Sequence, residues 1–333
     1  MRFLFVAFSS CICGLASHLT FAQDAFVTLR YSEDNAEERR YFITPAADGS
    51  YNLAKKFILA PDLDGYVRLR IKLKKPGFVY TSGLNQPLAI YVAPWQHVNV
   101  HIEETVFFTG DLRKENALIN DLKLPQELDV GAMSTATVFN KSLTFLINLD
   151  GSVVNDVLQV DRKTARNFTS FLPKTRAMRI LNKADSLIGQ KLNGDRRPDV
   201  DDSEYKEWEE FRARLFVDSL LNCGLTTSKD YSEYLMHYMN YLRSVHWEMP
   251  LGKDSVELAR YMKLADEQLP DGAKEPYMCM FLSSNILHGA PFYGRDLILF
   301  YEKFRKEFPQ SAAIPVLEPE MKRLAKIPPR AKK

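Results

Sequence analysis

The stretch Tyr66-Val67-Arg68-Leu69-Arg70-Ile71-Lys72-Leu73 decides the fold of the first part of this 333-residue chain. Its apolar side chains alternate with cationic ones, and in a β-strand successive side chains point to opposite faces. The pattern therefore predicts a strand with one buried face and one face in water. Shorter alternating segments lie on both sides of it, at Phe26–Tyr31, Leu88–Val92 and Val98–Ile102.

Turn signals separate these alternating segments from one another. They are Asp48-Gly49, Asp64-Gly65, Pro76-Gly77 and Pro94. Short strands divided by such turns are typical of antiparallel sheets, in which one face is packed and the other is solvated. Residues 23–111 are therefore predicted to form an antiparallel β-sandwich or half-barrel.

From about Leu112 onward the spacing of apolar residues becomes helical. Apolar stripes at intervals of three and four residues begin near Tyr205 and near Tyr231, and a third helix is expected after the Asp254-x-x-Glu257 capping pattern. Two more are expected, one with Pro276 near its first turn and one from about Asp296 to Phe308. Residues 112–333 are thus predicted to be all helical, as a bundle or a short solenoid. The predicted fold class is α+β.

Residues 1–22 have the pattern of a secretory signal. Arg2 precedes the mostly apolar run Phe3–Ala16, and a small residue, Ala22, precedes Gln23. A retained membrane anchor is the alternative, but polar residues interrupt the run and a spanning helix needs about 20 apolar residues. A lipoprotein signal at Cys11 or Cys13 is a further alternative, although the residues before each cysteine fit lipidation poorly. The expected location is the periplasm or cell envelope.

Composition narrows the class of protein further. Hydrophobic residues make up 46% and charged residues 26%, as in soluble globular proteins. Arg2 is the only charged residue of the leader, so its removal changes the formal charge from +2 to +1. A nearly neutral chain gives no indication of nucleic-acid binding. Cys223 and Cys279 remain, and they form either one disulfide in an oxidising compartment or two separately buried thiols.

One region resembles a known family. Leu88–Val100, with its Pro94 turn, is followed by Phe107-Phe108-Thr109-Gly110 and by Asn116-Ala117-Leu118-Ile119. This order resembles the amino-terminal β-domain of exported thioredoxin-like proteins of TlpA type from Gram-negative envelopes. The segment from Phe304 to Ser311 also resembles the helix that precedes their thioredoxin domain. Here Pro94-Trp95-Gln96 stands where that family has Pro-Gly-Asp.

In that family the redox chemistry belongs to a carboxy-terminal thioredoxin domain with a Cys-x-x-Cys motif. The printed sequence ends at Lys333, where the resemblance would place the start of such a domain, and neither remaining cysteine belongs to a Cys-x-x-Cys pair. The resemblance therefore implies either a stand-alone form of the front region or a shortened gene product. No thiol-disulfide exchange activity is expected of the chain itself, because exchange needs a nucleophilic thiolate and a nearby resolving thiol.

No catalytic, cofactor-binding or metal-binding residue is predicted. His97 and His101 share a strand face about 13 Å apart, and His237 and His246 fall on opposite faces of one helix about 13 Å apart along its axis, so neither pair can hold one metal ion. An aromatic series in the helical part is the candidate interaction surface, with core packing as the alternative: Tyr231, Tyr234, Tyr238, Tyr241 and Trp247.

The sequence thus favours an exported, non-enzymatic binding or assembly module whose expected partner is another envelope protein. The alternatives are an accessory component of a periplasmic thiol-disulfide system and a hydrolase with a dispersed site. An exposed aromatic patch would favour the binding module, and polar groups converging in a pocket would favour the hydrolase.

Overall fold

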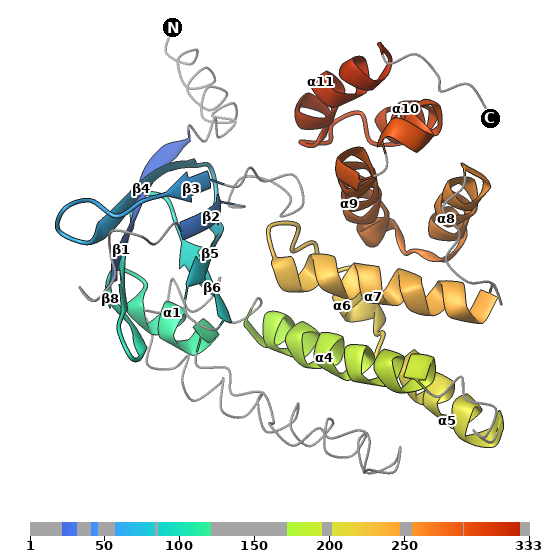
Figure 1. Cartoon of the computed structure of the whole chain (residues 1–333), viewed down its shortest axis with the longest axis horizontal. Helices are drawn as coiled ribbons and strands as arrows, with labels where there is room; N and C mark the ends of the chain where they lie inside the picture. Colours follow the sequence, from blue (N-terminus) through green and yellow to red (C-terminus); the bar gives the residue numbers. More distant parts are fainter. Residues whose placement is uncertain are drawn as a thin grey trace, which may run out of the picture.

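The computed structural model describes residues 22–31, 41–45, 57–83, 86–120, 172–194, 202–246, 255–288 and 290–326. Two β-sheets occupy the first part of the chain and helices the second, which confirms the expected α+β class (Figure 1). Residues 1–21, nearly all of the predicted signal, lie outside the described residues. The described helices include none that is long and apolar enough to cross a membrane.

The first sheet has the strand order β4-β1-β7-β8. Its strands are β1 (Gln23–Tyr31), β4 (Tyr66–Leu73), β7 (His97–Ile102) and β8 (Val106–Gly110). β1 pairs antiparallel with β4, as predicted, but parallel with β7. The expectation of a wholly antiparallel arrangement is therefore wrong for this pair. The two strands are distant in sequence, so no tight hairpin turn fixes their relative direction.

The second sheet has the order β3-β2-β5-β6, and its three strand pairs are antiparallel. Its strands are β2 (Tyr41–Pro45), β3 (Phe57–Leu59), β5 (Gly77–Gly83) and β6 (Gln86–Val92). Val79, Ile90 and Val92 join the inner side chains of the first sheet in one hydrophobic cluster. Phe78 and Tyr91 lie outside that cluster and are nevertheless buried. In β5 and β6 both faces are therefore covered, whereas one wet face was expected.

Helix α1 (Arg113–Asn120) covers the edge of β6 through two asparagine side chains. Asn116 accepts the Tyr91 N–H at 2.7 Å and donates to the Tyr91 carbonyl at 3.0 Å. Asn120 repeats this with Ala89, at 3.2 and 2.8 Å. Four helical residues rise about 6 Å and two strand residues about 6.6 Å, so the two spacings match. The amides act as an extra strand and protect the edge, which places α1 with the sheets rather than with the later helices.

The remaining helices form the second part of the molecule around their own hydrophobic cluster. They are α4 (Leu172–Gly194), α5 (Asp202–Ala213), α6 (Asp218–Leu221), α7 (Lys229–His246), α8 (Ser255–Gln268), α9 (Asp271–His288), α10 (Ala290–Glu307) and α11 (Ile314–Leu324). α7 packs against α4 and α9, and α10 packs against α9 and α11. Two residues that the sequence placed near helix ends lie near such ends in the structure. Gly224, with φ 68°, follows α6, and Pro276 lies early in α9.

Candidate functional site

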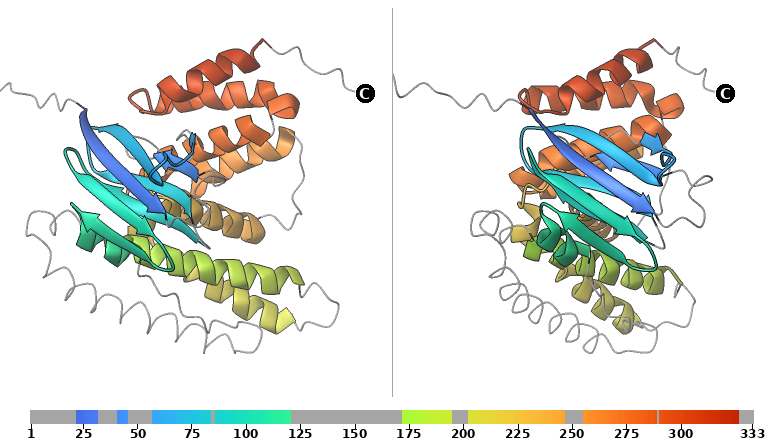
Figure 2. Two further views of the ribbon diagram at one scale, coloured as in Figure 1. Left: turned by 60° about the vertical axis from the view of Figure 1, so that its left-hand side comes forward. Right: turned by 90° about the vertical axis from the view of Figure 1, so that its left-hand side faces the viewer.

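The outer face of the first sheet is the candidate functional site. It points away from the helices and toward the viewer in the right panel of Figure 2. Strand alternation places the apolar side chains of β1, β4 and β7 in the interior, so the intervening residues lie on this face. They are Asp24, Phe26, Thr28, Arg30, Tyr66, Arg68, Arg70, Lys72, His97, Asn99, His101, Phe107 and Thr109.

Two aromatic pairs lie on this face, one toward each end of β7. Phe26 contacts His97, with ring centroids 5.9 Å apart, and Phe107 is stacked on His101 at 4.5 Å. Both phenylalanines are 42% exposed, although burial of such a ring would be favourable. The prediction that His97 and His101 share a strand face is confirmed. The two pairs thus present apolar surface to solvent on an otherwise polar sheet face.

Hydrogen bonds to threonines hold each imidazole in place. The Nε2 atom of His97 lies 3.0 Å from the hydroxyl of Thr28 on β1. The Nε2 atom of His101 lies 3.0 Å from the hydroxyl of Thr109 on β8. Each ring is thus fixed against a neighbouring strand, so the aromatic pairs are already ordered before any partner binds.

Cationic side chains lie along β4, at one edge of this face. Arg70 forms an ion pair with Asp24, and Arg68 forms one with Asp62. Hydrogen bonding to Arg70 is the main cause of the lowered pKa of Asp24, and the backbone N–H of Tyr66 is the main cause for Asp62. The Arg68 guanidinium also lies 4.9 Å from the centre of the Tyr66 ring. The face therefore combines exposed rings with positioned arginines.

Part of the aromatic surface predicted in the helical part of the chain is buried in the structure. Tyr231 and Tyr234 are fully buried, and their hydroxyls donate to the carbonyls of Leu221 and Leu215 at 2.7 and 3.0 Å. These two tyrosines therefore belong to the core, which was the alternative, because one side of α7 packs against α4 and α9. Of the other three predicted residues, Tyr238 and Tyr241 are half-buried against Phe216, and Trp247 lies outside the described residues.

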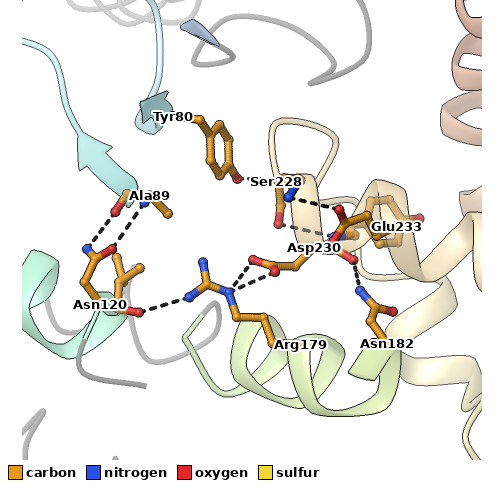
Figure 3. Close-up of polar contacts among 11 residues, drawn as sticks. Tyr80, Ala89, Asn120, Arg179, Asn182, Ser228, Asp230 and Glu233 are labelled. Atoms are coloured by element: carbon orange, nitrogen blue, oxygen red, sulfur yellow. Dashed lines mark hydrogen bonds and ion pairs between the residues drawn. The ribbon is translucent and has the colours of Figure 1, made fainter. Parts of the chain in front are cut away.

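An ion pair between two helices, largely buried, lies where the helices meet the sheet part of the chain (Figure 3). The Nε atom of Arg179, on α4, lies 2.8 and 2.9 Å from the two carboxylate oxygens of Asp230, on α7. Arg179 also donates to the carbonyl of Ile119 at 3.2 Å, and the Lys229 N–H donates to the Tyr80 hydroxyl at 2.8 Å. Burial raises the pKa of Asp230 despite the nearby guanidinium. These contacts fix the second sheet against α4 and α7.

A second buried ionic cluster joins three helices. Asp185 of α4 is 2% exposed, and its carboxylate lies 2.7 Å from Nδ1 of His237 and 3.1 Å from Nη2 of Arg212. Burial, the largest influence, would raise the pKa of Asp185, but the hydrogen bonds from His237 and Arg212 outweigh it and lower the pKa. The Asp185 carboxylate thus contacts Arg212 of α5 and His237 of α7 at the same time, and these contacts link both helices to α4.

Cys223 and Cys279 are free thiols, so the disulfide alternative is wrong in this structure. Cys279 is buried in the hydrophobic core of the helices, and Cys223 is half-buried and packs against that core. Burial raises the pKa of Cys279 to about 12 and also raises the pKa of Cys223. Neither thiol therefore has the lowered pKa of a reactive cysteine.

Comparison with known proteins identifies no relative, because no family model, curated protein or solved structure matches the chain.

Proposed function

We propose that this protein is an exported, non-enzymatic binding or assembly module of the periplasm or cell envelope, and that the outer face of the first sheet is its binding surface. The observation that carries this proposal is the pair of ordered, exposed ring contacts on that face, Phe26 with His97 and Phe107 with His101. Aromatic residues and arginine are enriched in protein interfaces, where a few of them supply most of the binding energy. The proposed partner is another envelope protein.

The architecture supports different roles for the two parts of the chain. In this proposal residues 23–111 form a β-sandwich, the later helices form a bundle, and the second sheet is fixed between the two. The covered faces of β5 and β6 and the ion pair of Arg179 with Asp230 support it. The outer face of the first sheet is left for a partner. Such an arrangement is similar to the front part of exported TlpA-type thioredoxin-like proteins.

An accessory role in a thiol-disulfide system remains the alternative within the same proposal. Both thiols of the described chain have raised pKa values, so the redox step would take place on a separate protein. The chain would then recruit or orient that protein through the same outer face.

Site-specific photo-crosslinking in intact cells tests the proposed function. A photoreactive amino acid replaces either Phe107 on the outer face or Leu299, which is 60% exposed on α10 and serves as the control. We expect a discrete protein adduct from position 107 and none of the same mass from position 299. The adduct should disappear when Phe26→Ser is added, because that change removes the second exposed ring of the surface. Equal adducts from both positions, or none from position 107, would contradict the proposal.

A further inference from the structure

A row of four side chains crosses the outer face of the first sheet at the end where β1 and β7 finish. The strand register places Tyr66 of β4 beside Arg30 of β1. On the other side of Arg30 lies His101 of β7, which is followed by Phe107 of β8. Neighbouring strands are about 4.8 Å apart, so each side chain can touch the next. We call these four residues the aromatic row, and Arg30 is its arginine.

Arg30 is held in place by a ring rather than by a carboxylate. Its guanidinium carbon lies 5.6 Å from the centre of the Tyr66 ring, within the range of a cation–π contact. The Arg30 side chain is exposed, and among the described residues its guanidinium forms no ion pair or hydrogen bond. The other two arginines of the outer face are each paired with an aspartate. Arg30 is therefore the arginine of this face whose N–H groups are left for a partner.

The Tyr66 ring is itself fixed by its surroundings. The Asp62 carboxylate accepts the backbone N–H of Tyr66 at 2.8 Å and that of Asp64 at 3.1 Å. The Asp62 N–H donates in turn to the Tyr66 carbonyl at 2.8 Å. Arg68, which is paired with Asp62, also lies 4.9 Å from the centre of the Tyr66 ring. The ring is thus anchored by the turn before β4, so Arg30 is positioned before any partner binds.

Carboxylates lie in the two turns at this end of the outer face. Besides the paired Asp62, they are Asp64, before β4, and Glu103 and Glu104, between β7 and β8. In the described part of the chain none of these three forms an ion pair with Arg30. A partner carboxylate is therefore attracted at Arg30 and repelled by the flanking turns, which restricts where it can bind.

We propose that Arg30 binds a carboxylate of the protein partner, and that an apolar side chain next to this carboxylate packs on Phe107. This inference rests on the proposed function, because it concerns the same outer face, and it specifies the chemistry of the partner. The planar guanidinium donates two parallel N–H bonds to one carboxylate while its flat side stays on the Tyr66 ring. Arginine and aromatic residues are also enriched among the residues that dominate binding energy at interfaces. The partner segment therefore carries aspartate or glutamate beside an apolar residue.

NMR titration with two matched tripeptides tests carboxylate binding at Arg30. The probes are acetyl-Leu-Asp-Leu-amide and acetyl-Leu-Asn-Leu-amide, which differ in a carboxylate against an amide, and the protein is the form that cells release after export. We expect the aspartate peptide to shift the Arg30 Nε–H signal saturably. The asparagine peptide should bind about ten-fold more weakly or less, because it lacks the charge-assisted bonds. The Nε–H of Arg305, which is paired with Glu302 on α10, serves as the control and should not shift.

Substitutions at position 30 separate the planar fork from the charge. Arg30→Gln should abolish the saturable shifts that the aspartate peptide causes in the Tyr66 and His101 ring signals. Arg30→Lys keeps the charge without the fork, so it should weaken binding about ten-fold. Arg305→Gln, the matched control, should bind the peptide as the wild type does. Both substitutions of Arg30 should leave the thermal midpoint nearly unchanged, because the side chain is exposed, so a loss of binding would not be due to unfolding.

The crosslink from position 107 applies the same test in cells. Arg30→Glu should abolish the adduct, whereas Arg305→Glu should leave it. A persistent adduct in Arg30→Glu would overturn the carboxylate proposal and leave the proposed function standing. Equal binding of the two peptides, no saturable shift at Arg30, or wild-type binding by Arg30→Gln would also overturn it. Absence of the adduct in the wild type would contradict the proposed function, while the carboxylate site at Arg30 would stand on the peptide titration.

Discussion

Replacing Arg179 by methionine should weaken the joint between the sheets and the helices. The Asp230 side chain is 9% exposed, and Arg179 supplies two of its hydrogen bonds as well as one to the Ile119 carbonyl. Methionine keeps the apolar stem but leaves a buried carboxylate without its counter-charge. Breaking a buried ion pair in this way costs about 3–5 kcal/mol of unfolding free energy. In a domain of this size that loss lowers the thermal midpoint by about 10 °C.

The destabilisation by Arg179→Met should depend on pH in a defined direction. Burial already raises the pKa of Asp230 in the wild type, and removal of the nearby guanidinium raises it further. A carboxyl group whose folded pKa exceeds its unfolded value penalises folding above the folded pKa, and the penalty falls as pH drops through that value. The difference between variant and wild type should therefore be largest near neutral pH and should shrink on acidification.

Urea unfolding at several pH values measures this difference. Arg323→Met is the matched control, because Arg323 is paired with Glu320 in an exposed contact, for which a loss of less than about 1 kcal/mol is expected. The argument would be refuted if both variants lost the same free energy near neutral pH, or if the loss from Arg179→Met did not change with pH.

Three further changes test other parts of the structure. Asn116→Ala or Asn120→Ala should each lower the free energy of unfolding in urea by about 2 kcal/mol. Each change leaves one N–H and one carbonyl at the β6 edge without the amide that now pairs with them. Asp185→Asn should destabilise the chain by about 3 kcal/mol near neutral pH. The lowered pKa of Asp185 gives stability above the unfolded value of 3.8 that disappears as pH falls through the folded value, so the variant's stability should change less in acid. A thiol reagent should label Cys223 and Cys279 slowly in the native protein, Cys279 the more slowly, and both rapidly after unfolding; a Cys223–Cys279 disulfide in the mature protein would contradict this.

Sequence periodicity predicted the strands well where one face meets water. The alternation in Tyr66–Leu73 gave both the strand and the side on which its cations lie. The same logic failed for β6, because its second face is covered by parts of the chain that follow in sequence, so side chains on both faces became apolar. The parallel pairing of β1 with β7 also has no local signal, since strand order is set by the collapse of distant segments.

The candidate site was only partly accessible from sequence. Periodicity placed His97 and His101 on one face, but it could not place Phe26 and Phe107 beside them, because those residues come from neighbouring strands. Helical period likewise says which residues share a side of α7 but not whether that side is buried. For this reason Tyr231 and Tyr234 were candidates for a surface although they lie in the core.

The arrangement of layers explains why the first sheet carries the proposed binding surface. β5 and β6 are covered on both faces, and the edge of β6 is satisfied by α1. Among the described strands, those of the first sheet are left with a broad face in water (Figure 2). Burying Phe26 or Phe107 inside the chain would need another layer, which the described part of the chain does not place there. Their exposure is therefore most economically explained by a layer that a partner supplies.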